Sequence, residues 1–123
     1  MMSVTEIQVT FDCEEPRRVA EFWCHVLGYV IEDSGVVCVD PTGTGPRLYF
    51  QRVPEHKVAK NRVHLDVRAG TGLVGAQRLA KLETECARLV ALGAVRVRLL
   101  LADDENESCM VMQDIEGNEF CLD

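Results

Sequence analysis

The sequence predicts an α+β fold in which one domain is built from two βαβββ modules. The order strand, helix and three strands occurs twice along the 123 residues. The stretches at the ends of the elements also correspond: "FDC" matches "LDV", "VLGYVIED" matches "ALGAVRVR", and "VDPTGTGPRLYF" matches "QDIEGNEFCL". One such module cannot bury both its helix and a full sheet face, so the two are expected to associate within a single domain, residues 1–123.

The first module is predicted over about residues 4–53. "VTEIQVTFDC" alternates as a strand does, and the next stretch has apolar residues at the spacing of one helical face: Val19, Phe22, Trp23, Val26 and Leu27. Pro16 suits the first turn of this helix, and Gly28 suits its end. Three short strands separated by turn residues follow: "YVIED", "VVCVD" and "PRLYFQRV".

After a polar connector at about residues 54–60, the second module is predicted over about residues 61–123. It reads as the strand "RVHLDVR", the helix "AQRLAKLETECARLVALG" and the strands "AVRVRLLL", "SCMVMQD" and "NEFCLD". "GTGLVG", between the first strand and the helix, has the spacing of a dinucleotide-binding loop. The chain is too short for the second nucleotide-binding half, so we interpret this stretch as an elongated, flexible joint.

Composition excludes several classes of function. Apolar residues make up 47% and charged residues 27%, and no apolar run approaches the length of a membrane helix. A net charge of −7 argues against nucleic-acid binding. The start of the chain lacks the pattern of a secretion signal, so a cytoplasmic location is expected. The six cysteines are scattered singly, and we expect them to be reduced, most of them in packing roles.

The chain resembles the glyoxalase/bleomycin-resistance/dioxygenase superfamily, also called the vicinal oxygen chelate proteins, and within it the short bacterial glyoxalase-like domains. The stretches that carry the resemblance are "FDCEEPRRVAEFWCHVLGY", "GPRLYFQRVPEHKVAKNRVHLDV" and "DIEGNEFCLD". The resemblance implies paired modules whose curved mixed sheet surrounds a central cleft, with the helices outside. It also implies a small-molecule ligand and makes a homodimer a candidate assembly.

Strand alternation sorts the side chains into two sets. Apolar residues are expected beneath the helices: Ile7, Val9, Phe11, Leu48, Phe50, Val63, Leu65, Val67, Phe120 and Leu122. The opposite face presents polar residues: Gln8, Thr10, Asp12, Arg47, Tyr49, Gln51, Arg62, His64, Asp66, Glu119, Cys121 and Asp123. Such a face either meets water or lines a cleft, and the resemblance favours a ligand-binding cleft.

Metal-binding members that this chain resembles place His on the opening strand and Glu on the closing strand of each module. Those positions fall here on Gln8, Tyr49, Arg62 and Cys121, and all four depart from the pattern. A guanidinium offers no lone pair, and Gln and Tyr replace His and carboxylate poorly. We therefore expect no metal at these positions and no cofactor. A divalent metal at displaced ligands remains the alternative, with His64, Cys121 and a nearby carboxylate.

Individual side chains suggest roles in such a cleft. His64 is the candidate general base, with Asp66 or Asp12 to tune it, and Cys121 is a candidate nucleophile. Arg62 is suited to hold an anionic ligand, and Trp23 either contacts the ligand or lies in the core. Each of these side chains also has an ordinary interpretation as a hydrogen-bonded or packed residue.

Three functions follow from these residues. The leading one is a metal-independent glyoxalase-like protein that binds a small anionic or aromatic, oxygen-rich molecule, either as a resistance-type binder or as a lyase or isomerase. The second is a metal-dependent lyase or dioxygenase with displaced ligands. The third is a non-catalytic interaction module.

Overall fold

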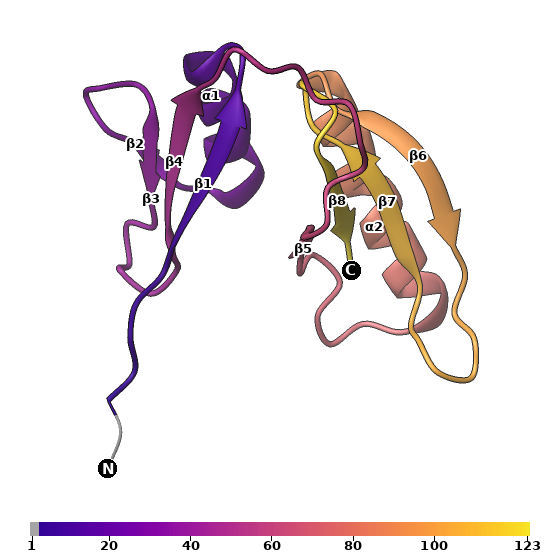
Figure 1. The fold of residues 1–123 in the computed structure, drawn as a ribbon. Coiled ribbons are helices and arrows are strands. Elements are labelled where there is room, and N and C mark those ends of the chain that lie inside the picture. Colours follow the sequence, from indigo (N-terminus) through magenta and orange to yellow (C-terminus); the bar gives the residue numbers. More distant parts are fainter. Residues whose placement is uncertain (1–2) are drawn as a thin grey trace. The chain divides into compact units, whose positions relative to one another are not determined.

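The computed structural model describes residues 3–123, which divide into two compact units, one ending at His56 and one comprising Lys57–Asp123. Each unit is described by itself. Unit 1 contains β1 (Gln8–Cys13), α1 (Pro16–Leu27), β2 (Val30–Ile31), β3 (Val37–Val39) and β4 (Arg47–Arg52). Unit 2 contains β5 (Leu65–Val67), α2 (Gly75–Ala91), β6 (Val95–Leu100), β7 (Cys109–Gln113) and β8 (Glu119–Leu122) (Figure 1).

The two units have the same topology, which confirms the prediction of two βαβββ modules. Unit 1 forms a four-stranded sheet in the order β1-β4-β3-β2, and unit 2 forms one in the order β5-β8-β7-β6. In each sheet the opening strand runs parallel to the closing strand, and the remaining neighbours are antiparallel. The helix between the first two strands makes the crossover that a parallel pair requires.

The core of unit 1 is an aromatic cluster between α1 and the sheet. Phe11 on β1 packs against Trp23 and Phe50, with ring centroids 5.2 Å and 5.0 Å apart. Trp23 is 1% exposed, so of the two roles considered for it, ligand contact or core packing, it has the second. As expected, Pro16 begins α1 and Gly28 ends it, at a positive φ of 70° that glycine adopts without strain.

A disulfide joins α1 to β3 and contradicts the expectation that all six cysteines are reduced. Cys24 and Cys38 are bonded, with their Cα atoms 6.1 Å apart. The two residues are 14 positions apart and lie in different elements, so only the packing of the helix on the sheet brings them together. Within residues 3–123 the remaining cysteines, Cys13, Cys86, Cys109 and Cys121, form no disulfide.

The core of unit 2 is mostly aliphatic and lies between α2 and the sheet. Its fully buried side chains are Leu82, Leu89, Met110, Met112, Phe120 and Leu122. Arg78 of α2 is also buried, and its guanidinium donates to the carbonyls of Ser108 and Gly70. The Gly70 backbone N–H in turn donates to the Asp123 carbonyl at 2.6 Å. The first glycine of "GTGLVG" is thus held by α2 and by Asp123, which differs from the flexible joint that was expected here.

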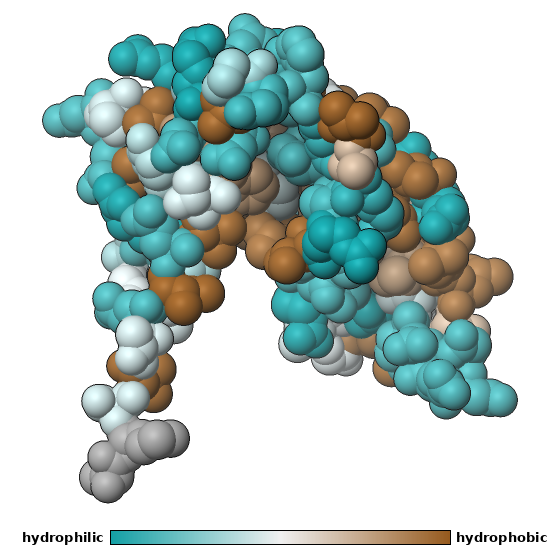
Figure 2. All heavy atoms as spheres, in the orientation of Figure 1, coloured by the Kyte–Doolittle hydropathy of each residue, from teal (hydrophilic) through white to brown (hydrophobic). Residues whose placement is uncertain are grey.

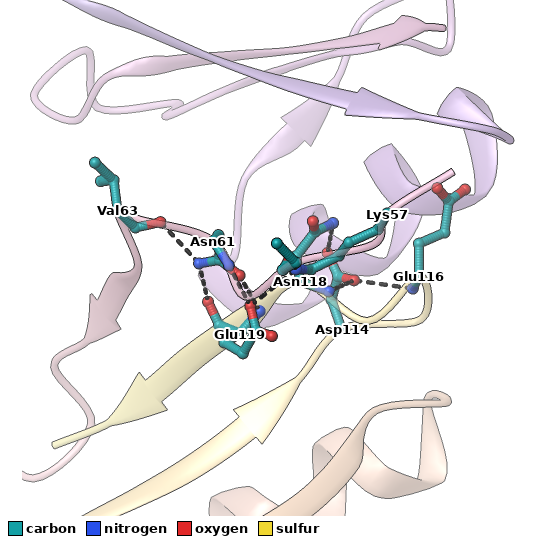
Figure 3. A network of polar contacts seen from close by, with 8 residues as sticks. Lys57, Asn61, Val63, Asp114, Glu116, Asn118 and Glu119 are labelled. Atoms are coloured by element: carbon teal, nitrogen blue, oxygen red, sulfur yellow. Dashed lines mark hydrogen bonds and ion pairs between the residues drawn. The ribbon is translucent and has the colours of Figure 1, made fainter. Parts of the chain in front are cut away.

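The opening strands begin later than the sequence predicts. Ile7 and Val63 precede β1 and β5 and are 70% and 80% exposed, so their expected burial was wrong. In unit 2, Asn61 explains the late start (Figure 3). Its side chain accepts from the Glu119 backbone N–H and donates to the carbonyls of Glu119 and Val63. The Asn61 amide therefore takes the partners that a longer β5 would need.

Exposed apolar side chains gather along β6, one of the two edge strands of the unit 2 sheet, and just beyond it (Figure 2). They are Val95, Val97, Leu100 and Leu101. The same strand carries Arg96 and Arg98, and such charges discourage further strand pairing at an exposed edge. No helix within residues 3–123 has the length and apolar character needed to cross a membrane.

Candidate functional site

The strand registers define which residues of the two units occupy equivalent positions. Tyr49 on β4 lies between Thr10 and Val37, and Cys121 on β8 lies between Asp66 and Val111. Val37 precedes Asp40 by three residues, as Val111 precedes Asp114. Tyr49 is therefore equivalent to Cys121, Thr10 to Asp66, and Gln8 to His64.

This register corrects the sequence alignment of the two halves by two residues. Matching "FDC" with "LDV" placed Arg62 at the position equivalent to Gln8. The ladders place His64 there instead, because His64 precedes Asp66 by two residues as Gln8 precedes Thr10. Arg62 lies before β5, is exposed, and is not among the residues that line the hollow described below.

Three predicted residues come together on unit 2: His64, Asp66 and Cys121. The imidazole Nε2 of His64 lies 3.1 Å from Oδ1 of Asp66. One donor atom from each of the three side chains lies within 4.8 Å of the other two. His64 and Asp66 are exposed, and Cys121 is half-buried. A nitrogen, an oxygen and a sulfur therefore face a common point that solvent can reach.

These side chains lie in a hollow of about 340 Å³ formed by unit 2 alone. Its lining residues are His64, Asp66, Arg78, Leu100, Leu101, Asp103, Asn106, Glu107, Cys109, Cys121 and Asp123. Four of these side chains carry carboxylates, whereas the guanidinium of Arg78 is already bonded to two backbone carbonyls. The hollow is therefore acidic and repels a ligand that is an anion by itself.

The thiol of Cys121 is poorly suited to act as a nucleophile by itself. Burial, together with the nearby Cys109 thiol and the Asp66 carboxylate, raises its pKa to about 11. Reactive cysteines have the opposite environment, with a cation or a helix N-terminus that lowers the pKa. Cys121 therefore remains a protonated thiol at neutral pH unless a cation enters the hollow.

The remaining predicted residues lie outside this cluster. Glu119 on β8 accepts from the Asn61 backbone N–H at 3.0 Å and pairs with Lys57 at 3.3 Å (Figure 3). Its carboxylate is thereby engaged in holding the segment before β5 against β8. The other predicted residues lie on the β1 and β4 strands of unit 1: Gln8, Thr10, Asp12, Tyr49 and Gln51.

Sequence reasoning missed Cys109, Arg78 and the loop that closes the hollow. Cys109 begins β7, where Met110 and Met112 are buried, so alternation alone assigns Cys109 to the same face as Val111. That signal was available in "SCMVMQD". The contributions of Asp103, Asn106 and Glu107 could not be read from the sequence, because they depend on how the β6 to β7 loop turns back.

Comparison with known proteins matches both units of the chain to a single family model. The model of the glyoxalase-like domain matches residues 8–122. A glyoxalase/bleomycin resistance protein/dioxygenase family enzyme from Burkholderia phytofirmans PsJN is similar in structure, with a TM-score of 0.67 at 15% identity over 94% of each chain. No match was found among curated proteins.

Fosfomycin resistance protein FosX from Listeria monocytogenes is also similar in structure. The hexagonal form gives a TM-score of 0.71 at 10% identity, over 98% of this chain and 93% of that one. An E126Q mutant of that protein, solved with Mn(II) and 1S,2S-dihydroxypropylphosphonic acid, gives a TM-score of 0.64 at 12% identity, over 99% and 90%. At these identities the structural likeness shows the fold alone, while the domain match over residues 8–122 shows that the chain belongs to the glyoxalase-like domain family.

Proposed function

We propose that this chain binds an oxygen-rich small molecule through a divalent cation held in the hollow of unit 2. The observation that carries the proposal is the meeting of His64, Asp66 and Cys121, whose donor atoms lie within 4.8 Å of one another. Three protein ligands with an open side are the usual arrangement of a metal site that also receives a ligand. The family relative solved with Mn(II) supports the choice of a metal over an empty polar pocket.

The residues of unit 2 fit such a cation, and those of unit 1 do not. Imidazole nitrogen, carboxylate oxygen and thiolate sulfur are all metal donors, whereas the equivalent Gln8, Thr10 and Tyr49 are neutral and bind divalent ions weakly. The cation would also offset part of the negative charge of the four carboxylates in the hollow, and it would give an anionic ligand a positive centre to bind. When bound, it would polarise oxygens of the ligand as a Lewis acid.

The chain's own residues supply the rest of the proposed site. His64, Asp66 and Cys121 would hold the cation, and the Cys121 proton would pass to solvent as it binds. Leu100 and Leu101 line the same hollow and give the apolar part of a ligand a surface to contact. The volume of about 340 Å³ suits a small metabolite-sized molecule.

Metal analysis of purified, tag-free protein tests the proposal. We expect one divalent ion per chain after loading and dialysis, measured by elemental analysis and native mass spectrometry. His64→Ala should weaken binding by more than about tenfold, since even outer-shell changes cost 10–100-fold. His25→Ala, which removes an imidazole from α1 in unit 1, is the matched control and should retain full binding. Equal binding by both variants, or none by the parent chain, would overturn the proposal.

A second function uses the same pair without metal. The contact of 3.1 Å between His64 and Asp66 also suits a general base whose imidazole is oriented by a carboxylate. In that case the ligand binds to protein that has been stripped with a chelator. Calorimetry on chelator-treated protein separates the two functions, because the metal-dependent one predicts no ligand binding until the ion is restored.

A further inference from the structure

A second thiol lies beside the proposed metal site. Cys109 is on β7 and Cys121 is on β8, next to it in the sheet. Cys121 is paired with Val111, so Cys109, two residues before Val111, points to the same face on the diagonal. Both cysteines line the acidic hollow, and neither takes part in a disulfide.

The two thiols are in contact. The Cys121 thiol is hydrogen-bonded to Cys109, and burial raises the pKa of both. The two sulfurs therefore lie on the same face of neighbouring strands, where one ion can contact both. The donor atoms that lie within 4.8 Å of one another are those of His64, Asp66 and Cys121, and Cys109 lines the same hollow beside Cys121. With Cys109 the site would offer two sulfurs, one nitrogen and one oxygen, and an oxygen of the small molecule would take a fifth position on the ion.

We propose that Cys109 joins Cys121 as a ligand, so that the cation of this site belongs to the thiophilic class, Zn²⁺ or Cd²⁺, and not to the Mn²⁺ and Mg²⁺ class. This inference rests on the proposed function and specifies which ion the same site takes. Thiolate and imidazole donors select such ions, whereas hard ions prefer sites made of oxygen. Binding forms two metal–sulfur bonds and releases two thiol protons to the buffer, with no change of oxidation state.

The chain therefore differs from its relative solved with Mn(II) in the kind of ion it would hold. Unit 1 offers no equivalent, because the position of Cys121 is Tyr49 there, and the position of Cys109, two residues before Val111, corresponds to Gly35, two residues before Val37. The thiol pair is confined to the hollow of unit 2, and its test can be made by substitutions in that unit alone.

Cobalt(II) reports the number of thiolates directly, because each cobalt–sulfur bond adds intensity to a charge-transfer band in the near ultraviolet. The full chain, reduced at its four non-disulfide cysteines, is titrated with Co²⁺, and the bound Co²⁺ is then displaced with Zn²⁺ or Mn²⁺. The variants are Cys109→Ser and Cys121→Ser. The control is Cys13→Ser in unit 1, where a hydroxyl can keep the hydrogen bonds to the carbonyls of Phe11 and Gln51. Far-UV circular dichroism verifies that each variant is folded.

We expect a two-thiolate band in the parent and control, about half that intensity in Cys109→Ser, and displacement by Zn²⁺ at a concentration roughly 100-fold lower than by Mn²⁺. An unchanged band in Cys109→Ser, or equal displacement by the two ions, would overturn this inference while leaving the proposed function intact. Absence of any Co²⁺ or Zn²⁺ binding in the parent would instead overturn the proposed function itself.

Discussion

Units 1 and 2 share a backbone plan but present different chemistry on their open sheet faces. In both, the opening strand is parallel to the closing strand, and an aspartate, Asp40 or Asp114, follows the third strand. Yet one face carries Gln8, Thr10 and Tyr49, where the other carries His64, Asp66 and Cys121. The buried alternation and the turns therefore maintain the fold, which leaves the side chains on the opposite face free to differ.

The two aspartates show that even the shared turn is stabilised differently. Asp114 is 1% exposed and accepts from the backbone N–H groups of Glu116 and Asn118 and from the Asn118 side chain. Asp40 accepts from Thr42 and from the Gly45 backbone N–H, in a more open environment. Hydrogen bonds to a buried carboxylate are stronger, and their donors are costly to leave unpaired.

Asp114→Ala should therefore have the largest effect on stability, a loss of about 4 kcal/mol, from three donors left without a charged acceptor. Asp40→Ala should cost much less. Urea denaturation followed by far-UV circular dichroism measures both. All tryptophan and tyrosine residues lie in unit 1, namely Trp23, Tyr29 and Tyr49, so fluorescence follows that unit alone. Equal losses of stability from the two substitutions would show that the buried Asp114 turn contributes no more than the more open Asp40 turn.

Reduction of the Cys24–Cys38 disulfide should have the second largest effect on stability. We expect the free energy of unfolding to fall by about 3 kcal/mol for a closed loop of this length. The bond is confined to unit 1, so the loss should appear in the Trp23 fluorescence transition. A phosphine reductant makes the change without mutation, and the double variant Cys24→Ala/Cys38→Ala, unaffected by the reductant, is the control. A thiol titration of the unfolded, unreduced chain that gives six thiols instead of four would show that the bond does not form.

Moving the donors of unit 2 into unit 1 tests whether the open face alone decides the chemistry. The triple variant Gln8→His, Thr10→Asp and Tyr49→Cys places the three donors on the same register positions. We expect a second ion per chain, bound about tenfold more tightly than by Gln8→His alone, or about 1.4 kcal/mol. Native mass spectrometry counts the ions. A stoichiometry that stays at one would show that more than register is needed.

The sequence allowed the fold to be predicted because its main signals are local. Pro16 and Gly28 mark the ends of α1, and the alternation of Phe120 and Leu122 with Cys121 assigns the faces of β8. Features that depend on tertiary packing could not be predicted in this way, since Cys24 and Cys38 meet only when α1 lies on β3. The alignment of the halves failed by two residues because strand register depends on pairing partners, and it was this error that made Arg62 seem equivalent to Gln8.

Substitution of Glu119 should have the smallest effect on stability. Glu119 binds Asn61 and Lys57, which belong to the segment that leads to His64. Although burial raises its pKa, hydrogen bonding to the Asn61 backbone and the Lys57 ammonium together bring the pKa of Glu119 below its usual range. A lowered pKa in the folded chain means that ionised Glu119 stabilises it. That stabilisation is fully present above the pKa in the unfolded chain, about 4.3, and is lost as the pH falls through the lower pKa of the folded chain.

Glu119→Gln should therefore cost about 1 kcal/mol at neutral pH and progressively less as the medium is acidified through this range. The matched variant is Glu55→Gln, an exposed glutamate in the connector of unit 1. Urea midpoints measured by far-UV circular dichroism from neutral pH to about pH 3 follow the difference. Asn61 precedes His64 by three residues, so loosening its contacts with β8 should also weaken metal binding slightly. If Glu119→Gln left both the acid dependence and the metal affinity unchanged, the network before β5 would have no part in holding the site.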